Sequence, residues 1–176
     1  MNLPKVKIFV DMDGVLAKWE YNSIETVNKK GYFANRPLDS VMGKLLELLN
    51  HWGYEIYILS AVFNNIHSGI EKDRWISKYF PFIPEENRIY IPYGSNKFEE
   101  ASKIVKISDF DVLIDDYTPN LREWKGFPVK YYNGVNGTKG TWHGFGLSYM
   151  SDAFWNFNEL KKALASLEKL AEGEKA

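Results

Sequence analysis

The chain has 176 residues, 45% of them hydrophobic, and a formal net charge of -1. These values predict a single globular domain over residues 1–176 and exclude a disordered chain. The balanced charge gives no general attraction to polynucleotides or anionic membranes, and the absence of cysteine excludes disulfides, thiolate metal sites and cysteine nucleophiles. Because no signal peptide precedes the first strand and no apolar run reaches membrane-spanning length, we expect a cytoplasmic protein.

The first predicted element is an apolar strand that ends in two carboxylates and a glycine. Residues 6–10 favour a strand buried on most of its faces, as in a parallel sheet. Asp11 and Asp13 follow it two residues apart and point the same way if the strand pleat continues, and Gly14 permits a sharp reversal of the backbone. The two carboxylates repel each other, and a bound divalent cation is the simplest compensation. An ordinary Asp-Gly turn is the plainer alternative.

Strands and helices alternate along the remainder of the chain. Residues 15–35 predict a short insertion after the first strand, and residues 133–149 give no clear assignment. Ile70, Trp75 and Ile76 are expected on the buried side of one helix. This alternation predicts an α/β fold with a doubly wound parallel sheet. Further strands are predicted at 55–61, 88–91, 111–116 and 129–132, and helices at 38–49, 68–79, 97–106, 119–124 and 152–172.

Polar side chains follow three of the predicted strands. In a parallel sheet the carboxyl ends of the strands share one edge, so these side chains should converge although they are far apart in the sequence. Carboxylates from two strands suit an oxygen-loving cation such as Mg²⁺, while a lysine and a hydroxyl suit phosphate oxygens. Each residue taken alone could be a turn residue, a helix cap or a solvated lysine, so the prediction depends on their joint occurrence. The set consists of Asp11, Asp13, Ser60, Asp115 and Asp116, with Lys97 at the expected start of a helix.

Four segments resemble, in order, the four motifs of the haloacid dehalogenase (HAD) superfamily of phosphotransferases. They are Asp11-Met12-Asp13-Gly14-Val15, Leu59-Ser60-Ala61, Lys97 and Leu113-Ile114-Asp115-Asp116. Within the superfamily, residues 53–61 and 115–121 are most similar to the 5′(3′)-deoxyribonucleotidase group and its small relatives in bacteria and phages. The resemblance implies a HAD-like Rossmannoid fold in which residues 15–35 form a small cap over the site.

The resemblance also implies a role for each motif residue. Asp11 would attack phosphorus and become a phospho-aspartate, and Asp13 would act as general acid and base. Ser60, Ala61 and Lys97 would bind the phosphoryl group. The ligands of Mg²⁺ would be Asp11, the backbone carbonyl of Asp13 and Asp115, with Asp116 as a further ligand or beside the ion.

The expected substrate is a small phosphorylated molecule, a nucleoside monophosphate. The insertion is shorter than the cap that nucleotidases usually carry, so its aromatic residues could either stack a nucleobase or form a small core of their own. A different phosphorylated metabolite, or a domain that binds a phosphorylated ligand without turnover, remains as an alternative. Polynucleotide and membrane partners are not expected, and the sequence leaves the oligomeric state open. The aromatic residues concerned are Trp19, Tyr21, Tyr32 and Phe33.

Overall fold

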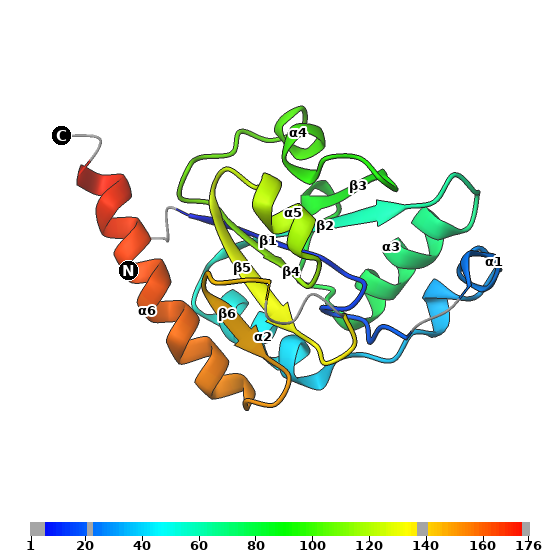
Figure 1. The fold of residues 1–176 in the computed structure, drawn as a ribbon, viewed down its shortest axis with the longest axis horizontal. Coiled ribbons are helices and arrows are strands. Elements are labelled where there is room, and N and C mark those ends of the chain that lie inside the picture. Colours follow the sequence, from blue (N-terminus) through cyan, green and yellow to red (C-terminus); the bar gives the residue numbers. More distant parts are fainter. Residues whose placement is uncertain (1–5, 21–22, 137–140, 174–176) are drawn as a thin grey trace.

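The computed structural model describes residues 6–20, 23–136 and 141–173, and it contains one six-stranded sheet (Figure 1). All neighbouring strands are parallel, in the order β3-β2-β1-β4-β5-β6. The predicted α/β fold with a doubly wound parallel sheet is therefore confirmed. The strands are β1 (Lys7–Val10), β2 (Glu55–Val62), β3 (Arg88–Pro92), β4 (Val112–Asp115), β5 (Phe127–Tyr132) and β6 (Gly146–Ser148).

Helices cover both faces of the sheet. Ile8 and Val10 of β1 belong to a core shared with three helices, whereas Phe9 points into a second core shared with two others. Since successive side chains of a strand point to opposite faces, β1 is apolar on both faces from Ile8 to Val10, as the run 6–10 predicted. The first face packs against α2 (Ser40–His51), α3 (Ser68–Tyr79) and α6 (Ala153–Gly173), and the second against α4 (Lys97–Ser102) and α5 (Thr118–Glu123).

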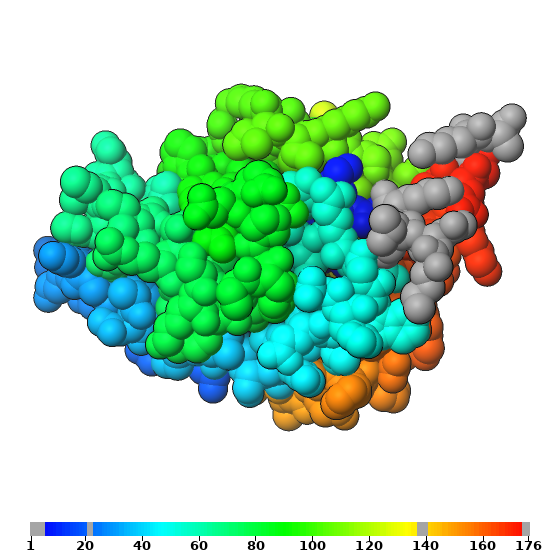
Figure 2. All heavy atoms as spheres, turned by 180° about the vertical axis from the view of Figure 1, so that it is seen from behind, coloured from blue at the N-terminus to red at the C-terminus, as the bar shows by residue number. Residues whose placement is uncertain are grey.

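The insertion after β1 contains a short helix, α1 (Ile24–Val27), and a 3-10 turn, η1 (Phe33–Asn35). It lies at the end of the molecule opposite α6, beside α3, as both the ribbon and the space-filling view show (Figures 1 and 2). Contacts between η1 and α3 hold it against the domain. A second 3-10 turn, η2 (Glu85–Asn87), precedes β3.

Two details of the sequence analysis differ from the structure. Strand β6 lies within residues 133–149, which gave no assignment, because a three-residue strand is too short to show a period. Ile70, expected on the buried side of α3, is 50% exposed. The buried side of α3 instead includes two charged residues, Glu71 and Lys72, beside Trp75 and Ile76.

Within the part of the chain that the structure describes, no helix combines the length and the apolar composition needed to cross a membrane.

Gly126, in the turn that joins α5 to β5, provides a test of how closely this turn packs against Asp111, just before β4. A Cβ at this position would overlap the carbonyl oxygen of Asp111, which already accepts hydrogen bonds from the Trp124 indole (2.9 Å) and the Phe127 amide (2.9 Å). We expect Gly126→Ala to lower the free energy of unfolding by about 1–3 kcal/mol, measured by urea denaturation. The matched control is Gly69→Ala on α3, where a Cβ meets only an ordinary contact at 3.9 Å and the fold should be as stable or slightly more so. Equal stability of the two variants would contradict the packing argument.

Candidate active site

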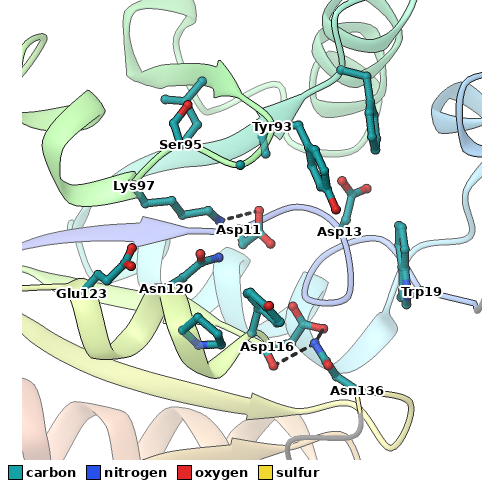
Figure 3. Close-up of a pocket in the computed structure, with 16 residues that line it drawn as sticks. Asp11, Asp13, Trp19, Tyr93, Ser95, Lys97, Asp116, Asn120, Glu123 and Asn136 are labelled. Carbon is teal, nitrogen blue, oxygen red and sulfur yellow. Dashed lines mark hydrogen bonds and ion pairs between the residues drawn. The ribbon is translucent and has the colours of Figure 1, made fainter. Parts of the chain in front are cut away.

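A cavity of about 530 Å³ opens at the carboxyl edge of the sheet (Figure 3). Asp11 and Asp116 directly follow β1 and β4, Ala61 lies near the end of β2, and all three line the cavity. The predicted convergence of strand ends is therefore present in the structure. Figure 3 shows Lys97 reaching Asp11 from one side and Trp19 standing at the other side of the cavity.

The Lys97 ammonium group connects three strands. Lys97 is the first residue of α4, as predicted, and the Asn96 side chain caps that helix. Its Nζ lies 2.9 Å from Asp11 Oδ1 and 2.7 Å from Asp115 Oδ2, and it donates a hydrogen bond to the Leu59 carbonyl at 3.0 Å. Burial alone would lower the pKa of Lys97, but the two carboxylates raise it above its ordinary value. This lysine therefore remains charged.

Three carboxylates form a compact cluster beside it. Each of Asp11, Asp115 and Asp116 offers an oxygen, and these oxygens all lie within 4.8 Å of one another. Burial, followed by the charges of Asp115 and Asp11, raises the pKa of Asp116 to about 8. Lys97 compensates for one of the three charges. A divalent cation would compensate for the other two, and an all-oxygen donor set is the type that Mg²⁺ prefers, so these residues fit a magnesium ion.

Amide groups hold the carboxylates of this cluster in place. Asn133 and Asn136 donate to Asp116 Oδ2 at 2.7 and 2.9 Å, and Asn133 also donates to the Gly14 carbonyl at 2.8 Å. The Asn120 side chain donates to Asp115 Oδ2 at 2.9 Å. Gly14 has a φ of +79°, and a Cβ there would overlap the Asp116 carboxylate, so both the backbone reversal and the close approach require glycine. The sequence analysis assigned none of these asparagines a role at the carboxylate cluster.

Asp13 lines the same cavity, and a second buried lysine holds it. Lys72 of α3 donates hydrogen bonds to the Asp13 carboxylate, to the Ser60 hydroxyl at 3.0 Å and to the Ala61 carbonyl. Burial raises the pKa of Asp13 above its ordinary value, although Lys72 opposes this shift. The sequence analysis missed Lys72. The available signal was its position three and four residues before two apolar residues of α3, which places a lysine on the buried face of that helix.

The remaining predicted residues lie at different depths. Ser60 is fully buried and is not among the residues that line the cavity, whereas its neighbour Ala61 is. Of the aromatic residues of the insertion, Trp19 lines the cavity, and Tyr32 and Phe33 do not. Phe33 is buried, and its ring contacts those of Tyr32 and Phe63. Of the two alternatives for the aromatic residues of the insertion, a small core fits Tyr32 and Phe33, and a place in the wall of the substrate pocket does not. Tyr21 lies outside the described residues.

Two aromatic residues that the sequence analysis did not identify complete the cavity wall. Phe63, just after β2, and Tyr93, just after β3, both line the cavity, and their rings stack at 4.6 Å with an interplanar angle of 22°. Together with Trp19 and Tyr117 they make four aromatic residues that line the cavity.

Comparison with known proteins gives a local sequence match and a fold match. No family model matches the chain. Two curated proteins described as 5′(3′)-deoxyribonucleotidases, from Bacillus subtilis (strain 168) and Bacillus phage SPbeta, are each 32% identical to it over 78 residues. These matches cover 44% of this chain, and the chain spans 39% of the length of each relative.

The solved structures provide the fold match. A crystal structure from Mesorhizobium loti, of a protein provisionally described as a HAD-like phosphatase, is similar with a TM-score of 0.59. The similarity covers 93% of this chain and 87% of that chain, at 12% sequence identity, and so concerns the fold alone.

Replacing one carboxylate of the cluster tests the metal site. We expect the wild type to melt at a higher temperature in Mg²⁺ than in EDTA. At a metal concentration 100-fold above Kd, binding should raise the free energy of unfolding by about 2.7 kcal/mol. Above pH 8, where the Asp116 carboxyl is ionised without metal, Asp116→Asn should be more stable than the wild type in EDTA, because one repelling charge is gone, and should gain less from Mg²⁺. The measurement is thermal unfolding with either additive.

Asp109→Asn is the matched control for that experiment, since Asp109 is an exposed aspartate outside the cluster. It should respond to Mg²⁺ as the wild type does. The same response in Asp116→Asn would show that Asp116 takes no part in metal binding.

Proposed function

We propose that this chain hydrolyses phosphomonoesters through a phospho-aspartate on Asp11, as its resemblance to the haloacid dehalogenase superfamily implies. The local similarity to two deoxyribonucleotidases and the fold shared with a protein described as a HAD-like phosphatase support the proposal. The observation that carries the proposal is the arrangement at the end of β1. Asp11 lines the cavity with its carboxylate 2.9 Å from the Lys97 ammonium group, and Asp13 lines the same cavity two residues later. A carboxylate nucleophile divides hydrolysis into two displacements, and a neighbouring acid/base serves both of them.

The proposed reaction has two steps at phosphorus. In the first, an Asp11 oxygen attacks phosphorus, the bond from phosphorus to the ester oxygen breaks, and Asp13 donates a proton to that oxygen, so that the alcohol leaves. In the second, Asp13 removes a proton from a water molecule whose oxygen attacks phosphorus, and inorganic phosphate leaves as the Asp11 carboxylate is restored. Lys97, with Ser60 and Ala61 at the end of β2, would bind the phosphoryl oxygens and stabilise their charge.

A magnesium ion is the proposed cofactor. Asp11, Asp115 and Asp116 would hold it, with the backbone carbonyl of Asp13 as a further ligand, and its chemical contribution is to neutralise charge on the transferring phosphoryl group. Until it binds, the raised pKa of Asp116 keeps that carboxyl partly protonated at neutral pH.

The proposed substrate class is nucleoside monophosphates. The local similarity to two deoxyribonucleotidases supports it, as do the aromatic side chains of Trp19, Phe63 and Tyr93 at the cavity, since such rings can stack on a planar base. Residues 15–35 act as the cap in this proposal and contribute Trp19. The domain boundary of that cap, like the phosphate-binding role of Ser60, is part of the proposal.

Phosphate release from a substrate panel tests the activity. We expect the purified protein to release phosphate from nucleoside 5′- or 3′-monophosphates with Mg²⁺ and not with EDTA. Asp11→Asn should reduce the rate by about 10⁴-fold, because the nucleophile is lost. Asp109→Asn, which changes an exposed aspartate, should keep wild-type activity.

The panel includes sugar phosphates and 4-nitrophenyl phosphate, so that activity and substrate class are judged separately. Release from the aryl or sugar esters alone would keep the phosphatase and overturn the nucleotidase. No release from any ester by a folded, Mg²⁺-stabilised protein would overturn the phosphatase and favour a domain that only binds a phosphorylated ligand.

Removing the Trp19 ring tests the base-binding wall. Trp19→Ala should raise KM for the preferred nucleotide by about 10-fold, since stacking on one ring contributes about 1–3 kcal/mol, and should leave KM for a sugar phosphate nearly unchanged. Trp52→Ala, at an exposed ring outside the cavity, is the control. A similar rise in KM for both kinds of ester would contradict stacking on Trp19.

A further inference from the structure

Helix α3 carries two adjacent buried charges that contact different parts of the molecule. Lys72 donates to Asp13 at the cavity, while the Glu71 carboxylate accepts hydrogen bonds from the backbone amides of Gly31 (2.6 Å) and Phe33 (3.2 Å) in the insertion. Lys72 is fully buried and Glu71 is 7% exposed, and neither lines the cavity. Their burial needs a reason, because lysine and glutamate are rarely buried without specific partners.

The Lys72 ammonium group is not placed to bind a substrate, because Lys72, unlike Lys97, does not line the cavity and its side chain is only 1% exposed. Its three N–H groups match the three acceptors already described, the Asp13 carboxylate, the Ser60 hydroxyl and the Ala61 carbonyl. The ring of Phe33 covers it, with Nζ 4.5 Å from the ring centroid, which adds a cation–π contact and shields the group from water. Lys72 therefore acts on Asp13 and not on a bound phosphate.

The two oxygens of Asp13 are in different situations. Oδ2 accepts from Lys72, whereas Oδ1 is buried and has no hydrogen-bond partner among the described residues. Since Lys72 fixes Oδ2, the carboxyl group cannot rotate freely, and its orientation at the cavity is set by this contact. Holding an acid/base in one orientation avoids the loss of rate that misplacement by about 1 Å can cause.

We infer that Lys72 is a positioning residue for Asp13, and that Phe33 and Glu71 make this orientation depend on the insertion being seated against α3. The inference rests on the proposed phosphatase activity and deepens it. It gives the insertion a role in proton transfer that is separate from contact with the substrate, because Phe33 contacts Lys72 and does not itself line the cavity.

This inference has a kinetic consequence that a general loss of folding would not produce. An alkyl ester releases a strongly basic alkoxide, which needs the proton from Asp13, whereas 4-nitrophenolate leaves readily without one. Misplacing Asp13 should therefore slow the hydrolysis of alkyl phosphates more than that of 4-nitrophenyl phosphate. The ratio of the two kcat values reports the position of the acid.

The experiment compares Lys72→Met with Lys72→Arg and with Lys78→Met. Lys78 is an exposed lysine on the same helix and serves as the matched control. With saturating Mg²⁺, we expect Lys72→Met to lower the alkyl-to-aryl ratio of kcat about 10-fold or more, Lys72→Arg to restore part of it, and Lys78→Met to leave it unchanged. Thermal unfolding of each variant checks that it is folded.

Two variants at the contact between the insertion and α3 provide a second test that does not alter Lys72. Phe33→Leu removes the ring face above the ammonium group, and Glu71→Gln weakens the hydrogen bonds to the insertion. Both should lower the alkyl-to-aryl ratio, by less than Lys72→Met does, and they carry the test if Lys72→Met does not fold.

Equal losses on alkyl and aryl esters in the folded variants, or an unchanged ratio, would overturn the inference and leave the phosphatase in place. A wild type that hydrolyses neither ester would overturn the proposed function, and the inference with it. The two failures are therefore distinguished by the wild type alone.

Discussion

The contact of the buried Lys97 ammonium group with Asp11 and Asp115 is the constraint on which this structure depends. Charged groups that leave water cost several kcal/mol each unless they are paired, and removing one partner of a buried pair typically costs about 3–5 kcal/mol. Lys97 reaches the ends of β1, β2 and β4 at the same time, so it fixes the relative position of the strands that carry the carboxylates. The same contact leaves two negative charges uncompensated, which is why the site suits a divalent cation.

Most of the fold could be predicted from the sequence because its signals are local. Buried strands give continuous apolar runs, and the α/β alternation with short connections leaves few topologies other than a parallel sheet. Helix α3 was predicted at its observed bounds, 68–79. Prediction failed where no period exists or where burial is decided by distant partners. Strand β6 is three residues long, and Ile70 is exposed because charged neighbours of α3 have acidic or backbone partners elsewhere in the chain.

The residues of the candidate site also fall into two groups, those that the sequence could place and those that it could not. Carboxylates that directly follow strands, such as Asp11 and Asp116, could be placed at one edge from the parallel topology alone. For Lys72, the spacing to Trp75 and Ile76 could indicate only that it lies on the buried face of its helix, because its partner Asp13 is 59 residues away in the sequence. Lys130 of β5 is a similar case, buried and donating to the Asp116 carbonyl and, at 3.1 Å, to the Thr118 hydroxyl. Lys72 and Lys130 therefore both lie on buried faces and both hold a group of the site in place.

The short insertion supports the site in two ways that its length alone would not suggest. Of the four aromatic residues that line the cavity, Trp19 alone comes from the insertion, because Phe63, Tyr93 and Tyr117 follow strands β2, β3 and β4. The sheet edge thus supplies walls that a larger cap would otherwise have to provide. That arrangement leaves Phe33 available to cover Lys72. One small segment thereby contributes a side chain to the cavity wall and another that covers the lysine holding Asp13. In the proposed reaction, substrate contact and proton transfer would therefore depend on the same piece of chain.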